Sequence, residues 1–225
     1  MHRSPNCGPR RNGATPDIIV LHYTAMPDWT AARDWLCNEE AEVSAHYLIS
    51  PQGEVVQLVD EDKRAWHAGA GAWGGVEDVN SRSIGIELSN DGASPFSAPL
   101  MDALEALLPD IMARWSVPPE RVIGHSDLAP GRKVDPGPRF DWTRLARGGM
   151  AISVDPPDAR TVDLTAFLSD LATAGYTAST DPDVLLPALR LRHRQGHEGP
   201  IDGRDCAIAA QLAARFPVAL GERTS

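Results

Sequence analysis

The hydrophobic positions of the chain form short runs of β type that alternate with stretches of helical spacing. Residues 17–25 are apolar and β-branched between two prolines, which predicts a buried strand that ends near His22. Residues 82–90 alternate strictly, so that Gly85 and Glu87 share one face of a second strand. The apolar residues of that strand share the other face: Ile84, Ile86 and Leu88.

The remaining patterns complete a sheet with helices around it. Residues 44–62 indicate an antiparallel hairpin with a Pro-Gln-Gly turn, and 119–125 a strand that ends at a histidine. Helical spacing covers 28–40 and 98–115, the second with Pro109 as an expected irregularity. Strands interleaved with helices, one hairpin among them, predict an α/β fold with a mixed central β-sheet flanked by helices.

The last third of the chain has a different character. Residues 151–160 are rich in Pro, Asp and other polar residues and are interpreted as a linker after a domain at 1–150. Residues 161–225 contain three helical stretches, which predict a small three-helix module. Aspartates stand where the helix N-caps belong: Asp163, Asp181 or Asp183, and Asp202 or Asp205.

Composition narrows the functional classes. The net charge of −10 argues against nucleic acid as a partner, because phosphate binding needs clustered basic surface. Three scattered cysteines indicate reduced thiols. The first residues lack the apolar region of a signal peptide, and no run is long enough to cross a membrane. A cytoplasmic monomer without a membrane partner is therefore expected, or a periplasmic one if the true start lies upstream.

One loop concentrates the candidate chemistry. The stretch GHSDLAPGRKVDPGP, at 124–138, follows the last predicted strand and carries His125, Asp135 and Lys133. Its prolines restrict φ, so the loop loses less entropy when it holds one shape. Asp127 is interpreted as a residue that orients the loop or a histidine rather than as a metal ligand.

Three strand ends now suggest one site. His22, His125 and Asp135 form the set of two imidazoles and one carboxylate that suits Zn²⁺ with one position open for water. Glu87 is then the candidate acid/base residue and Lys133 a candidate for the oxyanion. Spacing alone leaves open that each histidine is a hydrogen-bonded structural residue.

Five motifs in this order resemble one family: IVLHYTA, SAHYL, AWHAG, SIGIELSN and GHSDLAPGRKVDPGP. The stretch from about Pro16 to Leu145 is similar to the zinc-dependent N-acetylmuramoyl-L-alanine amidases of the AmpD and AmiD type, relatives of the peptidoglycan recognition proteins. The resemblance implies zinc bound by His22, His125 and Asp135, with Glu87 and Lys133 as catalytic residues. It implies hydrolysis of the amide between the lactyl group of N-acetylmuramic acid, or its 1,6-anhydro form, and L-alanine.

Other residues are expected to line a groove that binds peptidoglycan, either as soluble muropeptides or as the intact sacculus. These candidates for substrate binding are His46, His67, Trp73, Arg82 and Asn90, with packing and local hydrogen bonding as the alternative for the two histidines. In the C-terminal module, ALRLRHR followed by GPIDGRD resembles a helix and Asp-Gly turn of the three-helix peptidoglycan-binding domain of AmiD-type amidases, and a small helical packing module is the alternative.

Two other functions are compatible with parts of this pattern. A peptidoglycan-fragment receptor without catalysis would use the same fold, but the intact set of His22, His125, Asp135 and Glu87 speaks against it. A glycosidase that pairs Glu87 with a second carboxylate would ignore chelators and release no free peptide.

Overall fold

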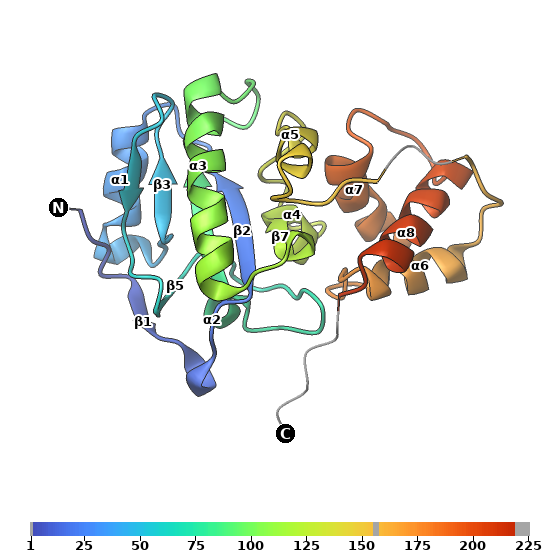
Figure 1. Cartoon of the computed structure of the whole chain (residues 1–225), viewed down its shortest axis with the longest axis horizontal. Helices are drawn as coiled ribbons and strands as arrows, with labels where there is room; N and C mark the ends of the chain where they lie inside the picture. The colour runs from blue at the N-terminus through green and yellow to red at the C-terminus, as the bar shows by residue number, and fades with distance from the viewer. Residues whose placement is uncertain (1, 155–157, 219–225) are drawn as a thin grey trace.

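A computed structural model describes residues 2–154 and 158–218, and it has a five-stranded mixed sheet in the order β4, β3, β6, β2, β7 (Figure 1). Neighbouring strands run parallel except β4, which forms the predicted antiparallel hairpin with β3. A separate antiparallel pair joins β1 to β5. The strands are β1 (Cys7–Pro9), β2 (Ile18–Tyr23), β3 (Tyr47–Ile49), β4 (Val55–Gln57), β5 (Lys63–Ala65), β6 (Ser83–Leu88) and β7 (Val122–Gly124).

Helices surround this sheet, as the sequence predicts. The α-helices are α1 (Trp29–Leu36), α2 (Val79–Arg82), α3 (Ala98–Trp115), α4 (His125–Leu128), α5 (Trp142–Arg147), α6 (Leu164–Thr173), α7 (Pro182–His193) and α8 (Gly203–Arg215). Three short 3-10 turns are η1 (Arg11–Gly13), η2 (Glu39–Ala41) and η3 (Pro119–Arg121). The α3 helix continues through Pro109 without a break. Among the described residues, no helix is both long and apolar enough to cross a membrane.

Alternation along the strands divides the core into two faces. The apolar side of β6 is buried with α3 in one cluster that includes Ile84, Ile86 and Leu104. Along β2, Ile19 and Leu21 join that cluster, whereas Ile18 and Val20 pack on the opposite side. Gly85 and Glu87 therefore face the second side, which confirms the orientation predicted for Glu87.

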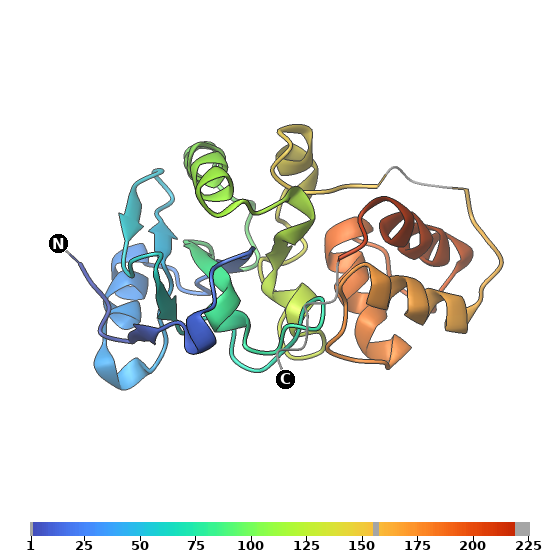
Figure 2. The same cartoon turned by 60° about the horizontal axis from the view of Figure 1, so that its bottom comes forward.

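That second side is shared with the C-terminal helices. Val20 and Ile123 belong to the same buried cluster as Phe167, Leu189 and Leu212 from α6, α7 and α8. Figures 1 and 2 show these helices next to α4, beyond the edge strand β7. The predicted linker at 151–160 includes residues 155–157, which lie outside the described residues, as do 219–225 of the predicted module. The division of the chain into two domains stays a prediction.

Side-chain caps fix where the C-terminal helices begin. Asp163, Asp181 and Asp202 each accept a hydrogen bond from a backbone N–H of the first turn. Asp202 forms a capping box with Asp205, and the two side chains thus satisfy donors at the start of α8. The three predicted starts are confirmed.

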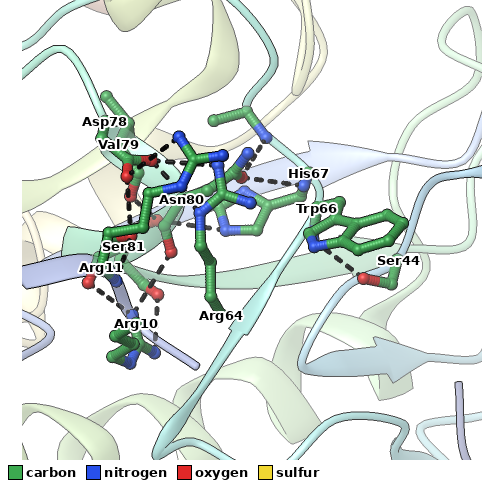
Figure 3. A network of polar contacts seen from close by, with 12 residues as sticks. Arg10, Arg11, Ser44, Arg64, Trp66, His67, Asp78, Val79, Asn80 and Ser81 are labelled. Carbon is green, nitrogen blue, oxygen red and sulfur yellow. Dashed lines mark hydrogen bonds and ion pairs between the residues drawn. The ribbon is translucent and has the colours of Figure 1, made fainter. Parts of the chain in front are cut away.

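The N-terminal arm is part of the fold. Arg10 is buried, and its guanidinium donates to the carbonyl oxygens of Asn80 and Ser81 (Figure 3). It also donates to the carbonyl oxygens of Glu61 and Ser83. Burial lowers the pKa of Arg10 to about 10. The Oδ1 atom of Asn80 in turn accepts hydrogen bonds from the backbone N–H groups of His67 and Ala68, at 3.0 and 2.9 Å. The arm thus supports the loop that follows β5.

Arg10→Met is expected to lower the free energy of unfolding by about 3 kcal/mol, because several buried carbonyl groups lose their donor. Equilibrium denaturation in urea measures the change. Arg11→Met is the matched control, since the Arg11 side chain is 67% exposed and lies 3.6 Å from Asp78. The control should shift stability by no more than about 0.5 kcal/mol. Equal losses in both variants would contradict the assigned role of Arg10.

Candidate metal centre and active site

The candidate site lies where three parallel strands end. The register pairs Leu21 of β2 with Gly124 of β7, so the next residues, His22 and His125, lie side by side at the carboxyl ends of neighbouring strands. Asp135 returns to the same place because the N–H of Ser126 donates to its carbonyl oxygen at 2.9 Å. The carboxyl ends of parallel strands meet at one edge of a sheet, and the fold uses this edge to bring the three residues together.

Three potential ligand atoms converge within this group. The Nδ1 atoms of His22 and His125 are 3.0 Å apart, and Oδ2 of Asp135 lies 2.9 and 3.0 Å from them. All three residues are buried, and they form a group whose ligand atoms could hold a metal ion. A tetrahedral ion with bonds of about 2.0–2.1 Å would keep its ligand atoms about 3.3 Å apart. The observed triangle is therefore close to the required size.

Protonation of the three groups suits a cation. Burial, followed by the neighbouring His125, lowers the pKa of His22 to about 4, so its imidazole is neutral at pH 7. Burial alone would raise the pKa of Asp135, but the contacts with His125 and His22 outweigh it and hold the pKa well below its ordinary value. The centre thus offers a neutral imidazole and a carboxylate.

A chain of hydrogen bonds assigns the tautomer of His22. The hydroxyl of Ser83 donates to the Val79 carbonyl at 2.6 Å, so its oxygen is free to accept from Nε2 of His67 at 3.1 Å. Burial lowers the pKa of His67 well below its ordinary value, and its neutral ring then has a bare Nδ1. That atom lies 3.1 Å from Nε2 of His22, which must donate. The Nδ1 atom of His22 therefore carries a lone pair.

The tautomer of His125 depends on a different partner. Its Nε2 lies 2.8 Å from the carbonyl oxygen of Ala68, which can only accept, so Nε2 carries the proton and Nδ1 is bare in the neutral ring. With both rings in this tautomer, two nitrogen lone pairs and a carboxylate oxygen face one another within 3.0 Å. This set of donor atoms suits a cation, and the residues present fit a metal ion.

Glu87 stands beside this group. His22 and Glu87 are register partners on the parallel strands β2 and β6, so their side chains leave the same face of the sheet. The Oε2 atom of Glu87 is buried and has no hydrogen-bond partner. Burial, followed by the charge of Asp135, raises the pKa of Glu87 well above its ordinary value, and Lys133 opposes that shift. Such a carboxyl group retains a proton where an exposed glutamate has lost it, which suits acid/base chemistry.

A pocket of about 400 Å³ opens over these residues. His22, His125, Asp135, Glu87 and Lys133 all line it. Its other walls include two tryptophans, Trp35 and Trp66, and the 23–26 segment after β2. The pocket therefore combines convergent polar groups with aromatic surface, as ligand sites commonly do.

The family model described as "N-acetylmuramoyl-L-alanine amidase", Amidase_2, matches residues 12–138, which contain every residue of this site. The chain belongs to the Amidase_2 family. The resemblance seen in the five sequence motifs is thereby confirmed, together with the class of enzyme.

Individual relatives extend the match beyond the catalytic segment. The N-acetylmuramoyl-L-alanine amidase AmiD of Escherichia coli is 34% identical, over 88% of this chain and 83% of that protein. The solved complex of E. coli AmiD with anhydro-N-acetylmuramic acid-L-Ala-D-γ-Glu-L-Lys has a TM-score of 0.82 and covers 92% of this chain and 93% of that one. The 1,6-anhydro-N-acetylmuramyl-L-alanine amidase AmpD of Enterobacter cloacae is 35% identical over 63% of this chain and 85% of its own length. The mixed α/β fold is confirmed by these comparisons.

Of the five predicted substrate residues, the structure brings only His67 to the pocket. His46 is fully buried, where its Nδ1 accepts the N–H of Gly85 at 2.9 Å and its Nε2 lies 3.0 Å from the Lys63 carbonyl oxygen. The alternative reading of His46, local hydrogen bonding, is the one that its contacts support. It binds backbone, so its polar atoms do not face the pocket.

Arg82, Asn90 and Trp73 also lie away from the pocket walls. Arg82 precedes β6, at the end of the strand opposite Glu87, and pairs with Asp17 at 2.5 Å. The side chain of Asn90 stabilises the loop after β6, because it accepts a hydrogen bond from the Gly92 N–H and donates one to the Ser94 carbonyl oxygen. Trp73 is only 2% exposed and packs edge-on against Tyr176 at 4.9 Å. None of the three lines this pocket, and their expected contact with substrate stays a prediction.

Some residues of the site carry no signal in the sequence. Arg132, which a loop sequence would leave in solvent, donates to the carbonyl oxygens of Ala68 and Ala70. It thereby ties the His125 loop to the AWHAG loop. Gly85 leaves room for His67, because a Cβ there would lie 2.5 Å from the imidazole ring. In the sequence, a glycine within the strand pattern, on the face opposite the apolar residues, is the signal that indicates such a close approach.

Proposed function

We propose that the chain is a zinc-dependent amidase that cleaves the bond between the lactyl carbonyl of N-acetylmuramic acid and the nitrogen of L-alanine. The observation that carries this proposal is the meeting of the Nδ1 atoms of His22 and His125 with Oδ2 of Asp135 within 3.0 Å, beside the buried Oε2 atom of Glu87, which has no hydrogen-bond partner. His22, His125 and Asp135 would hold the ion. Bound zinc supplies Lewis acidity and a hydroxide at neutral pH.

The side chains of the pocket supply the proton chemistry. Glu87 in its ionised form takes the proton of the attacking water and delivers it to the L-alanine nitrogen, which leaves as an amine. The Lys133 ammonium lines the same pocket and stabilises the oxyanion that forms as the carbonyl becomes tetrahedral. His67 and Ser83 keep the His22 ring in the tautomer that ligation needs.

The substrate proposed is a muropeptide, with the 1,6-anhydro form favoured. Support comes from the names of the relatives, since the AmiD complex contains an anhydro-muramyl tripeptide and AmpD is named for the anhydro substrate. Within the pocket, the indoles of Trp35 and Trp66 offer flat surfaces against which a sugar ring can stack.

Mass spectrometry of the products tests the proposal. The chain is incubated with an anhydro-muramyl tripeptide and, separately, with intact sacculi, each with zinc and with a chelator. We expect free peptide with an L-alanine amino terminus in the zinc samples and none with the chelator. Release from sacculi as well would widen the substrate to the polymer. If no zinc-replete sample releases peptide, the enzyme proposal fails and the receptor takes its place.

A further inference from the structure

Asp127 closes the turn that presents His125. It lies two residues after His125 and is fully buried. Its Oδ2 atom accepts the N–H of Gly124 at 2.8 Å, so the carboxylate bonds the chain on the other side of His125. The orienting role expected for Asp127 is borne out by this contact. The position of the imidazole thus depends on a buried negative charge.

The partners of that charge come from the C-terminal helices. Nη1 of Arg192, on α7, donates to Oδ2 of Asp127 at 2.8 Å. The hydroxyl of Tyr176, between α6 and α7, donates to Oδ1 at 2.9 Å. The Arg192 and Asp127 side chains are 2% and 0% exposed, which makes this a fully desolvated ion pair. A buried carboxylate needs such partners to remain charged.

Arg192 holds the same turn at a second point. Its Nη2 donates to the carbonyl oxygen of Val122 at 2.9 Å, and its guanidinium stacks over the ring of Trp142 at 4.5 Å. The planar guanidinium of Arg192 therefore binds the chain at two points, three residues before His125 and two residues after it. Arginine suits this task because its donors are fixed in a rigid fork.

We propose that Arg192 and Tyr176 are positioning residues for the metal centre, and that the C-terminal module acts as a structural part of the active site. The inference rests on the proposed function, because it takes His125 to be a ligand. The shared buried cluster of β2, β7 and α6 to α8 agrees with this role. Without Arg192, the buried carboxylate of Asp127 loses its cationic partner. The turn that carries His125 is then held less firmly.

The test measures zinc affinity of the full chain by competition with a chromophoric chelator, and the visible spectrum of the Co²⁺ form. Arg192→Met is expected to weaken zinc binding about 10- to 100-fold, the range for groups that orient metal ligands, and to shift the Co²⁺ bands. Arg192→Lys restores a charge but cannot reach both acceptors, so it recovers part of the loss. Tyr176→Phe, which removes one hydrogen bond, should cost about fivefold.

Arg190→Met is the matched control. Arg190 lies on the same helix and forms a buried ion pair with Asp205 of α8, and its other acceptors are carbonyl oxygens of the loop between α7 and α8, at Gly199 and Pro200. The control should unfold at a lower temperature yet keep zinc affinity and the Co²⁺ spectrum. Wild-type affinity in Arg192→Met, or an equal loss in Arg190→Met, overturns the proposal.

Two further outcomes separate this inference from the metal site itself. If Arg192→Met does not fold, Tyr176→Phe decides, and unchanged zinc affinity there overturns the proposal. If the wild-type chain binds neither zinc nor Co²⁺, the proposed metal centre fails and the inference falls with it.

Discussion

Asp135→Asn is expected to lose its zinc on dialysis and to slow turnover by on the order of 10³-fold, because several kcal/mol of transition-state stabilisation depend on the metal. The amide oxygen of asparagine carries no charge and leaves two neutral imidazoles as the remaining ligands. The loss of zinc is measured as metal content per chain by elemental mass spectrometry. The loss of turnover is measured as the rate of peptide release.

Asp34→Asn serves as the control for that substitution. Asp34 is a 67% exposed carboxylate that pairs with the neighbouring Arg33, away from the candidate ligands. This variant should keep both zinc and activity. An Asp135→Asn enzyme that retains one zinc per chain and turns over normally would remove Asp135 from the set of ligands.

Glu87→Gln is expected to lower kcat by about 10²- to 10⁴-fold while zinc stays bound, since glutamine has nearly the same shape but cannot transfer a proton. Comparing kcat with the metal content separates proton transfer from metal binding. Loss of zinc in this variant would argue instead that Glu87 belongs to the ligands. Activity close to wild type would end its assignment as the acid/base residue.

The same substitution should not weaken the metal-free fold. Burial raises the pKa of Glu87 above its value in the unfolded chain, so the ionised form opposes folding as the pH rises through the ordinary range of glutamate. Glutamine removes that cost. Metal-free Glu87→Gln should therefore unfold at the same temperature as wild type at pH 7, or at a higher one.

The sheet and the central residues could be predicted because their signals are local. Alternation along β6 assigned Glu87 to one face, and the strand ends placed His22 and His125 at a common edge. Asp135 follows in the same loop as His125. A parallel sheet converts these separate local patterns into one site, since its topology brings the carboxyl ends of the strands together.

Residues whose surroundings the sequence did not reveal have partners far away in the chain. Trp73 in a glycine-rich loop has the local signature of an exposed binding surface, but it is buried in a cluster that includes Tyr176 from the C-terminal part of the chain. Arg10 lies in a polar arm and becomes a core residue through carbonyl groups of 61–83. Tertiary contacts of this kind leave no trace in periodicity or composition.

His46 shows a related difficulty. Its position next to Tyr47 in a strand was compatible with a pocket wall, but both ring nitrogens are used by backbone groups of β6 and β5. Which face of a short strand meets a pocket depends on the neighbouring loop. The pattern of three residues in β3 is too short to decide it.

The contact between Trp73 and Gly175 has a consequence for inheritance. A Cβ at Gly175 would lie 2.6 Å from the indole, and the φ of +111° at this residue independently favours glycine. A helical module that replaced the present one by recombination would therefore have to keep glycine at this position, or the indole of Trp73 would have to move.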